Sequence, residues 1–250
     1  MHPIICKLGP FTIYSYGLML AIAFLVASSL ASLEAKRRGV NPDIIFNFSF
    51  IVFVSGVIGA RIFYIAQNIS YYRENPIDII MLQQGGLSWF GGLGAGVLLG
   101  IIYLKKKRLS VYKIFDLIAP FVALAQGLGR IGCLLNGCCF GKVSMYGIYF
   151  EVHNSILIPT QLYSSLILTF IFIILRLSQE KPHKAGEIFF LYLLLYSIKR
   201  FFIEVWRADN SVVLFNPTLF QILSILIFFL SLIKLVFIKK SRAQNGAHPG

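Results

Sequence analysis

Four long stretches of this chain contain no Asp, Glu, Lys or Arg, and this feature most restricts how the chain can fold. They cover residues 8–33, 79–104, 152–175 and 210–233. Each is long enough for a helix that crosses the hydrocarbon core of a bilayer, which takes roughly 20 residues. Isolated charges interrupt three further apolar stretches, at 44–67, 113–135 and 186–206. The pattern predicts an all-α integral membrane protein with about seven transmembrane helices.

Basic residues are unevenly distributed among the connections between these stretches. They concentrate at 36–38, 105–108, 176–184 and 234–242. Because cytoplasmic connections carry the excess of Lys and Arg, the N-terminus is predicted outside and the C-terminus in the cytoplasm. Attraction to an anionic inner leaflet accounts for the formal net charge of +13, so the chain is not expected to bind nucleic acid.

The chain is predicted to form a single polytopic membrane domain over residues 1–240. Only Lys7 precedes the first apolar stretch, while three basic residues follow it. This order is the reverse of a cleavable signal peptide, so the first stretch is expected to remain as a helix. No internal repeat is evident, which disfavours a transporter. The polar residues 241–250 are expected to form a disordered cytoplasmic tail.

Four basic residues lie inside the apolar stretches, and they are Arg61, Arg130, Lys199 and Arg200. A charge at the centre of a bilayer costs about 2.5 kcal/mol or more, and it is normally paired or directed into a polar cavity. Internal ion pairs that fix helix packing are one explanation. The same stretches contain fewer acidic than basic residues, however, and the excess of positive charge favours an anionic ligand.

Arginines gather near the predicted outer surface. Arg200, Glu204 and Arg207 are spaced i, i+4 and i+7 and therefore share one face of a helix. Arg130 lies near the outer end of another predicted helix. The planar guanidinium group suits bidentate contact with phosphate. We therefore predict a binding site for a lipid phosphate near the outer leaflet.

Glycines concentrate in "QGGLSWFGGLGAG", residues 84–96. Gly92, Gly96 and Gly100 repeat at a spacing that is typical of close packing between membrane helices. Gly85 and Gly86 are interpreted instead as a turn that lines a cavity, because a glycine backbone can approach a ligand closely.

Three cysteines, Cys133, Cys138 and Cys139, accompany Arg130 in "GRIGCLLNGCCFGK", residues 129–142. They lack the paired C-x2-C spacing of zinc sites and have no neighbouring histidine, so neither a metal nor another cofactor is expected. Packing of small buried residues near glycines is the commoner use of such cysteines. A membrane thiol–disulfide oxidoreductase that uses Cys138 and Cys139 is the alternative.

Six motifs follow one another in an order shared with a known family. They are "SYG" at 15–17, "GARIFY" at 59–64, "GGLSWFGGLGAG" at 85–96, "GRIGCLLNGCCFGK" at 129–142, "PTQLY" at 159–163 and "RFFIEVWRADN" at 200–210. In these motifs the chain resembles the bacterial prolipoprotein diacylglyceryl transferases. The resemblance extends from about Tyr14 to Gln221, which is nearly the whole chain.

The resemblance implies an activity at the bacterial inner membrane. A diacylglyceryl group would pass from phosphatidylglycerol to the lipobox cysteine thiol of a preprolipoprotein, with release of glycerol phosphate. Arg130 and Arg200 would hold the phosphate, whose charge grows as the carbon–oxygen bond breaks. Glu204 would orient Arg200 or accept the thiol proton. The substrate-binding residues would be Tyr16, Arg61, Gly85, Gly86, Asn136, Gly141, Gln161, Tyr163 and Arg207.

Several of these residues have simpler structural alternatives. Tyr16 and Tyr163 could be interfacial aromatics, and Arg61 could be a structural or snorkelling residue. Gln161 and Asn136 could satisfy neighbouring backbone groups.

The chain departs from the family at positions where well-known members have histidine. Phe90 and Ile158 replace these two histidines, so no histidine base can be assigned. Cys133 and Cys138 stand where those members have Asn and Glu. Because arginines lower the pKa of a nearby thiol, the substrate thiolate could form without a dedicated base. A divergent relative that acts on another lipid or acceptor is the alternative.

Overall fold

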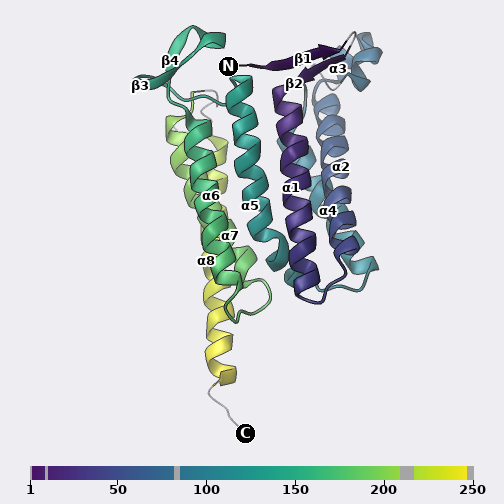
Figure 1. The fold of residues 1–250 in the computed structure, drawn as a ribbon, viewed down its shortest axis with the longest axis vertical. Helices are drawn as coiled ribbons and strands as arrows, with labels where there is room; N and C mark the ends of the chain where they lie inside the picture. The colour runs from purple at the N-terminus through teal and green to yellow at the C-terminus, as the bar shows by residue number, and fades with distance from the viewer. Residues whose placement is uncertain (1, 9–10, 82–84, 209–216, 247–250) are drawn as a thin grey trace. The chain divides into compact units, whose positions relative to one another are not determined.

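The computed structural model describes residues 2–8, 11–81, 85–208 and 217–246, and most of them are helical (Figure 1). The long helices in these ranges are α1 (Ser15–Arg37), α2 (Pro42–Gln67), α4 (Trp89–Lys106), α5 (Val111–Asn136), α6 (Thr160–Gln179), α7 (Glu187–Trp206) and α8 (Leu219–Gly246). Shorter helical elements are α3 (Ile69–Glu74), η1 (Pro76–Ile80) and η3 (Glu151–His153). The strands are β1 (Ile4–Leu8), β2 (Phe11–Tyr14), β3 (Val143–Phe150) and β4 (Ser155–Leu157).

Within the described ranges, five helices are long and apolar enough to cross a membrane, and they are α1, α2, α5, α6 and α8. Of the other two long helices, α4 ends with Lys105 and Lys106, and α7 contains several charged residues. The chain is therefore a mostly helical membrane protein, as the sequence predicts. The count of seven crossings and the orientation of the termini stay predictions.

Two antiparallel hairpins lie outside the all-α prediction and shorten two of the predicted helices. Cys6 of β1 is opposite Ile13 of β2, and Phe150 of β3 is opposite Ser155 of β4. The first uncharged stretch begins with strand residues and the third with η3 and β4, so their helices start only at Ser15 and Thr160. Uncharged length alone cannot distinguish an apolar strand from the first turns of a helix.

The remaining two uncharged stretches also begin before their helices do. α4 starts at Trp89, after η1, and α8 starts at Leu219. At its other end α8 continues to Gly246, inside the segment predicted to be a disordered tail. Residues 247–250 of that tail and residues 209–210 of the "RFFIEVWRADN" motif lie outside the described residues.

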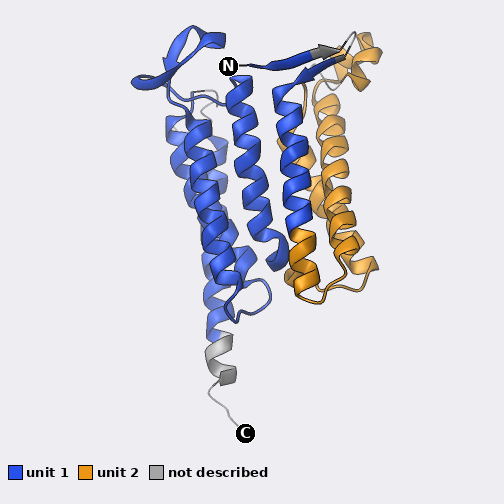
Figure 2. Ribbon diagram, in the orientation of Figure 1, with its two compact units in different colours: residues 1–30, 115–250 blue, residues 31–114 orange. Residues whose placement is uncertain are grey.

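The helices belong to two compact units (Figure 2). Unit 1 contains residues 1–30 and 115–250, and unit 2 contains residues 31–114. The single domain predicted for residues 1–240 stays a prediction.

The core of unit 1 lies among α5, α6 and α7. Its buried members are Ala119 and Ala123 of α5, Ile171 and Leu175 of α6, and Ile188 and Tyr192 of α7. The two alanines leave room for the larger side chains of α6 and α7 to reach α5, as interdigitated packing requires.

Asp116 of α5 fastens the N-terminal end of α7 to this core. Its carboxylate accepts a hydrogen bond of 2.6 Å from the Gly186 N–H and one of 2.8 Å from the Phe189 N–H. These N–H groups belong to the first turn of α7, where they have no acceptor within the helix. Asp116 therefore acts as a helix cap in this structure and not as the counter-charge of an arginine.

In unit 2, α2 and α4 pack through glycines. A Cβ atom added to Gly91 would lie 2.4 Å from the Gly59 carbonyl oxygen, and one added to Gly96 would lie 3.2 Å from the Val52 oxygen. Gly92 and Gly100 also face α2 closely. The prediction of close helix packing at Gly92, Gly96 and Gly100 is confirmed, and α2 contributes Gly56 as the small residue opposite Gly92 and Gly96.

Candidate active site

The segment that follows α5 turns back onto the end of that helix. Gly137 and Cys139 both have positive φ angles, of 76° and 62°. The Gly137 N–H donates to the Leu134 carbonyl at 3.2 Å, and the Cys138 N–H donates to the Cys133 carbonyl at 3.1 Å. These bonds satisfy the last carbonyls of the helix. They also keep Cys138 and Cys139 beside the final turn of α5.

Two residues at the start of α6 hold this turn. Thr160 Oγ1 donates to the Cys139 carbonyl at 2.6 Å, and Gln161 Nε2 donates to the Cys138 carbonyl at 2.6 Å. Gln161 is fully buried, and its Oε1 has no hydrogen-bond partner among the described residues. The structure thus shows Gln161 in contact with the backbone of the cysteine-containing turn.

The same segment is joined to the end of α7. Gly141 pairs with Arg207 in an antiparallel bridge, and the Lys142 N–H donates to the Trp206 carbonyl at 2.8 Å. The motif that contains Arg130 and the motif that contains Arg207 therefore meet. Figure 1 shows this end of unit 1, where α5 ends and α6 begins.

Arg200 and Glu204 form a buried ion pair on α7. Arg200 Nη2 lies 3.1 Å from Glu204 Oε2, and the two residues are 8% and 3% exposed. Glu204 Oε1 accepts a hydrogen bond of 2.9 Å from Thr218 Oγ1. The Arg200 guanidinium lies 4.3 Å from the centre of the Phe220 ring, which is within the range of a cation–π contact. Both oxygens of Glu204 are engaged, and the carboxylate fixes the direction of Arg200.

Further positive charge surrounds this pair. Arg207 and Arg130 are close enough for their like charges to repel that of Arg200. Lys199 is buried, with its ammonium 5.1 Å from the centre of the Tyr196 ring. Arg130 is half-buried, and none of the ion pairs in the described part of the chain includes it. Arg130 is therefore available to an anion from outside the chain.

The sulfur atoms of Cys133, Cys138 and Cys139, called here the thiol cluster, all lie within 4.8 Å of one another. Cys133 is buried, and the other two residues are partly exposed. Hydrogen bonds with the two neighbouring thiols lower the pKa of the Cys139 thiol below its ordinary value. The charges of Arg130 and Arg207 act in the same direction, against the opposing effect of burial.

Three other predicted residues lie around the thiol cluster or near Arg207. Tyr16 of α1 interacts electrostatically with Arg130 and with the cluster. Asn136 bonds to the Cys138 side chain, and the Tyr163 ring makes an edge contact with Trp206 at 6.4 Å. Tyr16 and Tyr163 are 39% and 37% exposed, so both residues reach the surface of unit 1.

The comparisons with known proteins agree with this arrangement. A family model described as "Prolipoprotein diacylglyceryl transferase" matches residues 3–237. The chain belongs to the prolipoprotein diacylglyceryl transferase family. A Clostridium tetani protein named phosphatidylglycerol–prolipoprotein diacylglyceryl transferase is 37% identical over 84% of this chain and 86% of its own length. Proteins of the same name from Lactiplantibacillus plantarum and Streptococcus pyogenes are 34% and 35% identical, each over 98% of this chain and over 92% and 97% of their own lengths.

The remaining predicted site residues of this prolipoprotein diacylglyceryl transferase family member belong to unit 2. Arg61 is buried, and its guanidinium donates to the carbonyls of Gly85 at 2.6 Å, Gly86 at 3.1 Å and Ile79 at 3.0 Å. It also donates to the Asp78 carbonyl. Gly85 and Gly86 have φ angles of 84° and 78°, which glycine adopts without strain. In the structure Arg61 thus holds the turn that contains both glycines.

We expect Arg61→Ala to lower the melting temperature of the detergent-solubilised protein strongly. The substitution removes the donor of the hydrogen bonds to the carbonyls of Asp78, Ile79, Gly85 and Gly86, and a hydrogen bond with a charged group contributes about 1.5–3 kcal/mol. Arg73→Ala removes an exposed arginine of α3 and serves as the matched control. Equal melting temperatures for the two variants would contradict this role of Arg61.

Gly141 is a further position at which the structure admits only glycine. A Cβ atom there would lie 2.7 Å from Ile158 Cβ and 2.8 Å from the Trp206 carbonyl oxygen. We expect Gly141→Ala to separate the segment from α7 and to lower the melting temperature, as measured by thermal unfolding in detergent. Gly129→Ala is the control, because a Cβ atom at that position of α5 meets nothing within 4 Å. A stable Gly141→Ala protein would show that the contact is dispensable.

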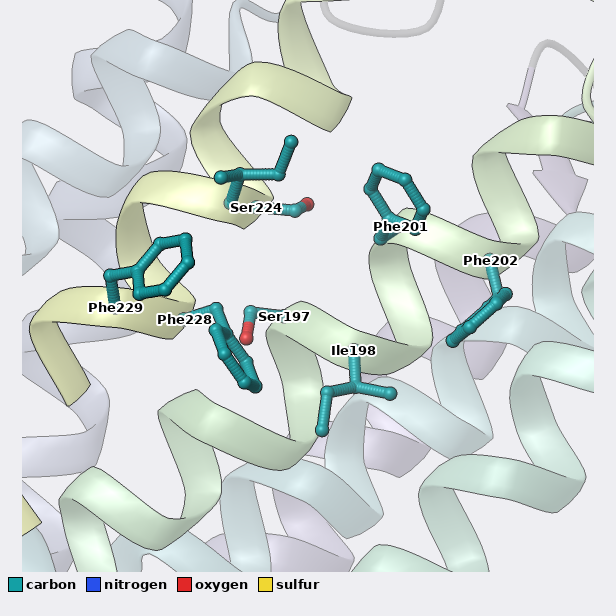
Figure 3. Close-up of a pocket in the computed structure, with 8 residues that line it drawn as sticks. Ser197, Ile198, Phe201, Phe202, Ser224, Phe228 and Phe229 are labelled. Carbon is teal, nitrogen blue, oxygen red and sulfur yellow. The ribbon is translucent and has the colours of Figure 1, made fainter. Parts of the chain in front are cut away.

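An apolar groove lies between α7, which carries Arg200, and α8. It has a volume of about 170 Å³ and is lined by Ser197, Ile198, Phe201, Phe202, Ser224, Ile225, Phe228 and Phe229. Figure 3 shows the side chains of the two helices on either side of it. Apart from Ser197 and Ser224, its lining residues are all apolar.

Several contacts of the candidate site were not predicted from the sequence. Thr160 belongs to the "PTQLY" motif, which indicates a site near this residue. The motif does not indicate that the Thr160 hydroxyl bonds to the Cys139 carbonyl. Thr218 and Phe220 precede or begin α8 and contact the Arg200–Glu204 pair only because of how α8 packs. The His153 ring of η3 is another such contact, because its Nε2 lies 2.9 Å from the Gly137 carbonyl oxygen in the turn after α5.

Proposed function

We propose that this family member transfers the diacylglyceryl group of phosphatidylglycerol to the lipobox cysteine thiol of a preprolipoprotein. The products are a thioether-linked lipoprotein precursor and glycerol phosphate. The observation that carries the proposal is the cluster of Arg130, Arg200 and Arg207, in which Arg130 has no carboxylate partner among the described residues. The names of the relatives give the same donor and acceptor for those proteins.

The arginines would act on the leaving group. When the glyceryl carbon–oxygen bond breaks, the phosphate changes from a diester with one negative charge to a monoester with two. Fixed guanidinium groups in a site shielded from water stabilise this additional charge without reorganising. Arg130 and Arg200 would contact the phosphate oxygens, and Arg207 would contact the headgroup.

Glu204 would orient Arg200 and would not be the base. One of its oxygens faces Arg200 and the other accepts from Thr218, so the carboxylate is already committed. Tyr16, Asn136, Gly141, Gln161 and Tyr163 would line and position the site in unit 1. Arg61, Gly85 and Gly86 of unit 2 stay proposed substrate-binding residues.

The membrane topology proposed for the chain places this chemistry at the outer leaflet of the bacterial cytoplasmic membrane. Seven crossings, with the N-terminus outside and the C-terminus in the cytoplasm, follow from the distribution of basic residues. The α7–α8 groove would take an acyl chain of the donor lipid. No nucleic-acid partner is expected.

A mass-shift assay tests the proposal. Purified protein is incubated with phosphatidylglycerol and a peptide that contains a lipobox with one cysteine, and a Cys→Ser peptide is the control. We expect the mass of a diacylglyceryl group to be added to the cysteine peptide alone. A folded protein that binds phosphatidylglycerol but modifies neither peptide would instead indicate a different lipid or acceptor.

A further inference from the structure

The thiol cluster is not used by the proposed transfer, although it lies among the same residues. Cys133 is on the last turn of α5, and Cys138 and Cys139 follow it after a turn with two positive φ angles. Their spacing does not match a common zinc motif, which is why the sequence indicated no metal. The fold nevertheless brings all three sulfur atoms within 4.8 Å of one another.

The sulfur positions fit a metal ion bound by three thiolates. An ion at the centre of a triangle with 4.8 Å edges lies about 2.8 Å from each sulfur, and zinc–sulfur bonds are about 2.3 Å long. A tetrahedral zinc ion keeps its sulfur ligands about 3.8 Å apart, so from separations of at most 4.8 Å each sulfur moves by about 0.6 Å or less. Side-chain rotation supplies such movements.

Hydrogen bonds from α6 fix the backbone that carries two of the three cysteines. The carbonyls of Cys138 and Cys139 each accept a 2.6 Å hydrogen bond, from Gln161 and Thr160. Cys139 has the left-handed backbone, with φ of 62°, that non-glycine residues adopt at a cost of roughly 1–3 kcal/mol. Outer contacts of this kind fix the direction of ligands before the ion binds.

The cluster also has the ligand count of a catalytic zinc site. Among the described residues, no His, Asp or Glu side chain joins the three cysteines. Catalytic zinc ions are typically held by three protein ligands and keep the fourth position open. Three thiolates and Zn²⁺ together carry one negative charge, and Arg130 interacts electrostatically with Cys133 and Cys139. The nearby arginine therefore complements the charge of the loaded site.

We propose that Cys133, Cys138 and Cys139 bind Zn²⁺ and that the open fourth position takes the thiol of the acceptor peptide. The zinc site is inferred from the positions of the three sulfur atoms and from the hydrogen bonds that fix their backbone. The identity of its fourth ligand rests on the proposed transferase function, in which a thiol must attack a carbon beside a phosphate bound by Arg130.

The chemistry of this step balances without a further reactant. The acceptor thiol loses its proton to water when its sulfur binds zinc, because a coordinated thiol is deprotonated. A lone pair of that sulfur then forms the bond to the glyceryl carbon. The carbon–oxygen bond to the phosphate breaks, and its electron pair leaves with glycerol phosphate. Zinc thereby replaces the base that Phe90 and Ile158 do not provide.

Metal content is the first test. Protein purified without chelator is analysed for zinc by mass spectrometry, beside single Cys→Ser variants at the three positions. Cys6→Ser is the matched control, because Cys6 is an exposed cysteine of β1 outside the cluster. We expect about one zinc ion per chain in the wild type and the control, and roughly tenfold less or lower in each cluster variant. Cys138→Ser and Cys139→Ser alter partly exposed residues, so these variants test the site even if Cys133→Ser does not fold.

Cobalt substitution tests the open position. Co²⁺ added to the metal-free protein should give a tetrahedral sulfur-to-metal charge-transfer spectrum. We expect the lipobox cysteine peptide to intensify this band and the Cys→Ser peptide to leave it unchanged. A spectrum that does not respond to the cysteine peptide would overturn thiol binding at zinc.

The outcomes separate the zinc site from the transferase function. Transfer by a metal-free protein at the full rate would refute the role of zinc and leave the proposed function intact. Zinc binding with a cobalt response, but without transfer from phosphatidylglycerol, would refute the proposed donor or reaction and leave the site intact. Wild-type protein that lacks zinc and contains a disulfide between two of the three cysteines would overturn the site itself.

Discussion

Arg130→Ala is expected to lower the kcat/KM of diacylglyceryl transfer by roughly a hundredfold or more, the loss seen when a single donor to a developing oxyanion is removed. Arg130 has no ion-pair partner among the described residues, so its loss leaves no buried carboxylate uncompensated. The variant should therefore retain its melting temperature in detergent. The measurement is the rate at which the lipobox peptide gains mass at several lipid concentrations.

The matched variant is Arg130→Lys. Lysine keeps the positive charge but loses the planar fork, so part of the activity should return. If Arg130→Ala transfers lipid at the wild-type rate while folded, the assignment of the phosphate to Arg130 fails. If both variants melt early, Arg130 is a structural residue and the activity loss has another origin.

Glu204→Gln is expected to reduce both stability and activity. The substitution keeps a side chain that can accept from Thr218 but removes the charge that faces Arg200. Removing one partner of a buried ion pair typically costs about 3–5 kcal/mol, and the higher exposure of Arg200 places this pair at the lower end. Released from Glu204, Arg200 would also lose its fixed direction toward the phosphate. Thermal unfolding and the transfer assay measure the two effects.

The pH dependence of transfer distinguishes an orienting Glu204 from a base. If Glu204 only orients Arg200, Glu204→Gln lowers the rate at every pH and leaves the shape of the profile unchanged. Loss of the acidic limb in Glu204→Gln would show that this carboxylate accepts the thiol proton. Thr218→Val is the control, because it removes the other contact of Glu204 and keeps the charge pair, and we expect a smaller loss.

The helices could be predicted from the sequence because apolar length alone decides which segments can cross a bilayer. The hairpins could not, since β3 and β4 are as apolar as the helix that follows them. Two local features separate the second hairpin from the helix that follows it. Asn154 adopts a positive φ of 46°, and Pro159 precedes the first turn of α6. The glycine repeat of α4 predicts a close contact, whereas the identity of its partner, Gly56, depends on which helix lies opposite.

In the candidate site, too, contacts within one helix could be predicted from the sequence, and contacts between distant segments could not. The spacing of Arg200 and Glu204 on one helix predicts their pairing, since residues four apart are neighbours on a helix surface. The joining of the motif that contains Arg130 to the end of α7 depends on the bridge between Gly141 and Arg207, which are distant in the sequence. The thiol cluster was missed because its ligands meet through the backbone conformations of Gly137 and Cys139, which no spacing rule encodes.

The unpaired state of Arg130 has a consequence for turnover. A site whose positive charge is left for its ligand holds a doubly charged phosphate monoester more firmly than a singly charged diester. We therefore expect glycerol phosphate to compete with the next donor lipid. Small water-soluble phosphomonoesters and phosphonates should accordingly act as inhibitors without any acyl chain.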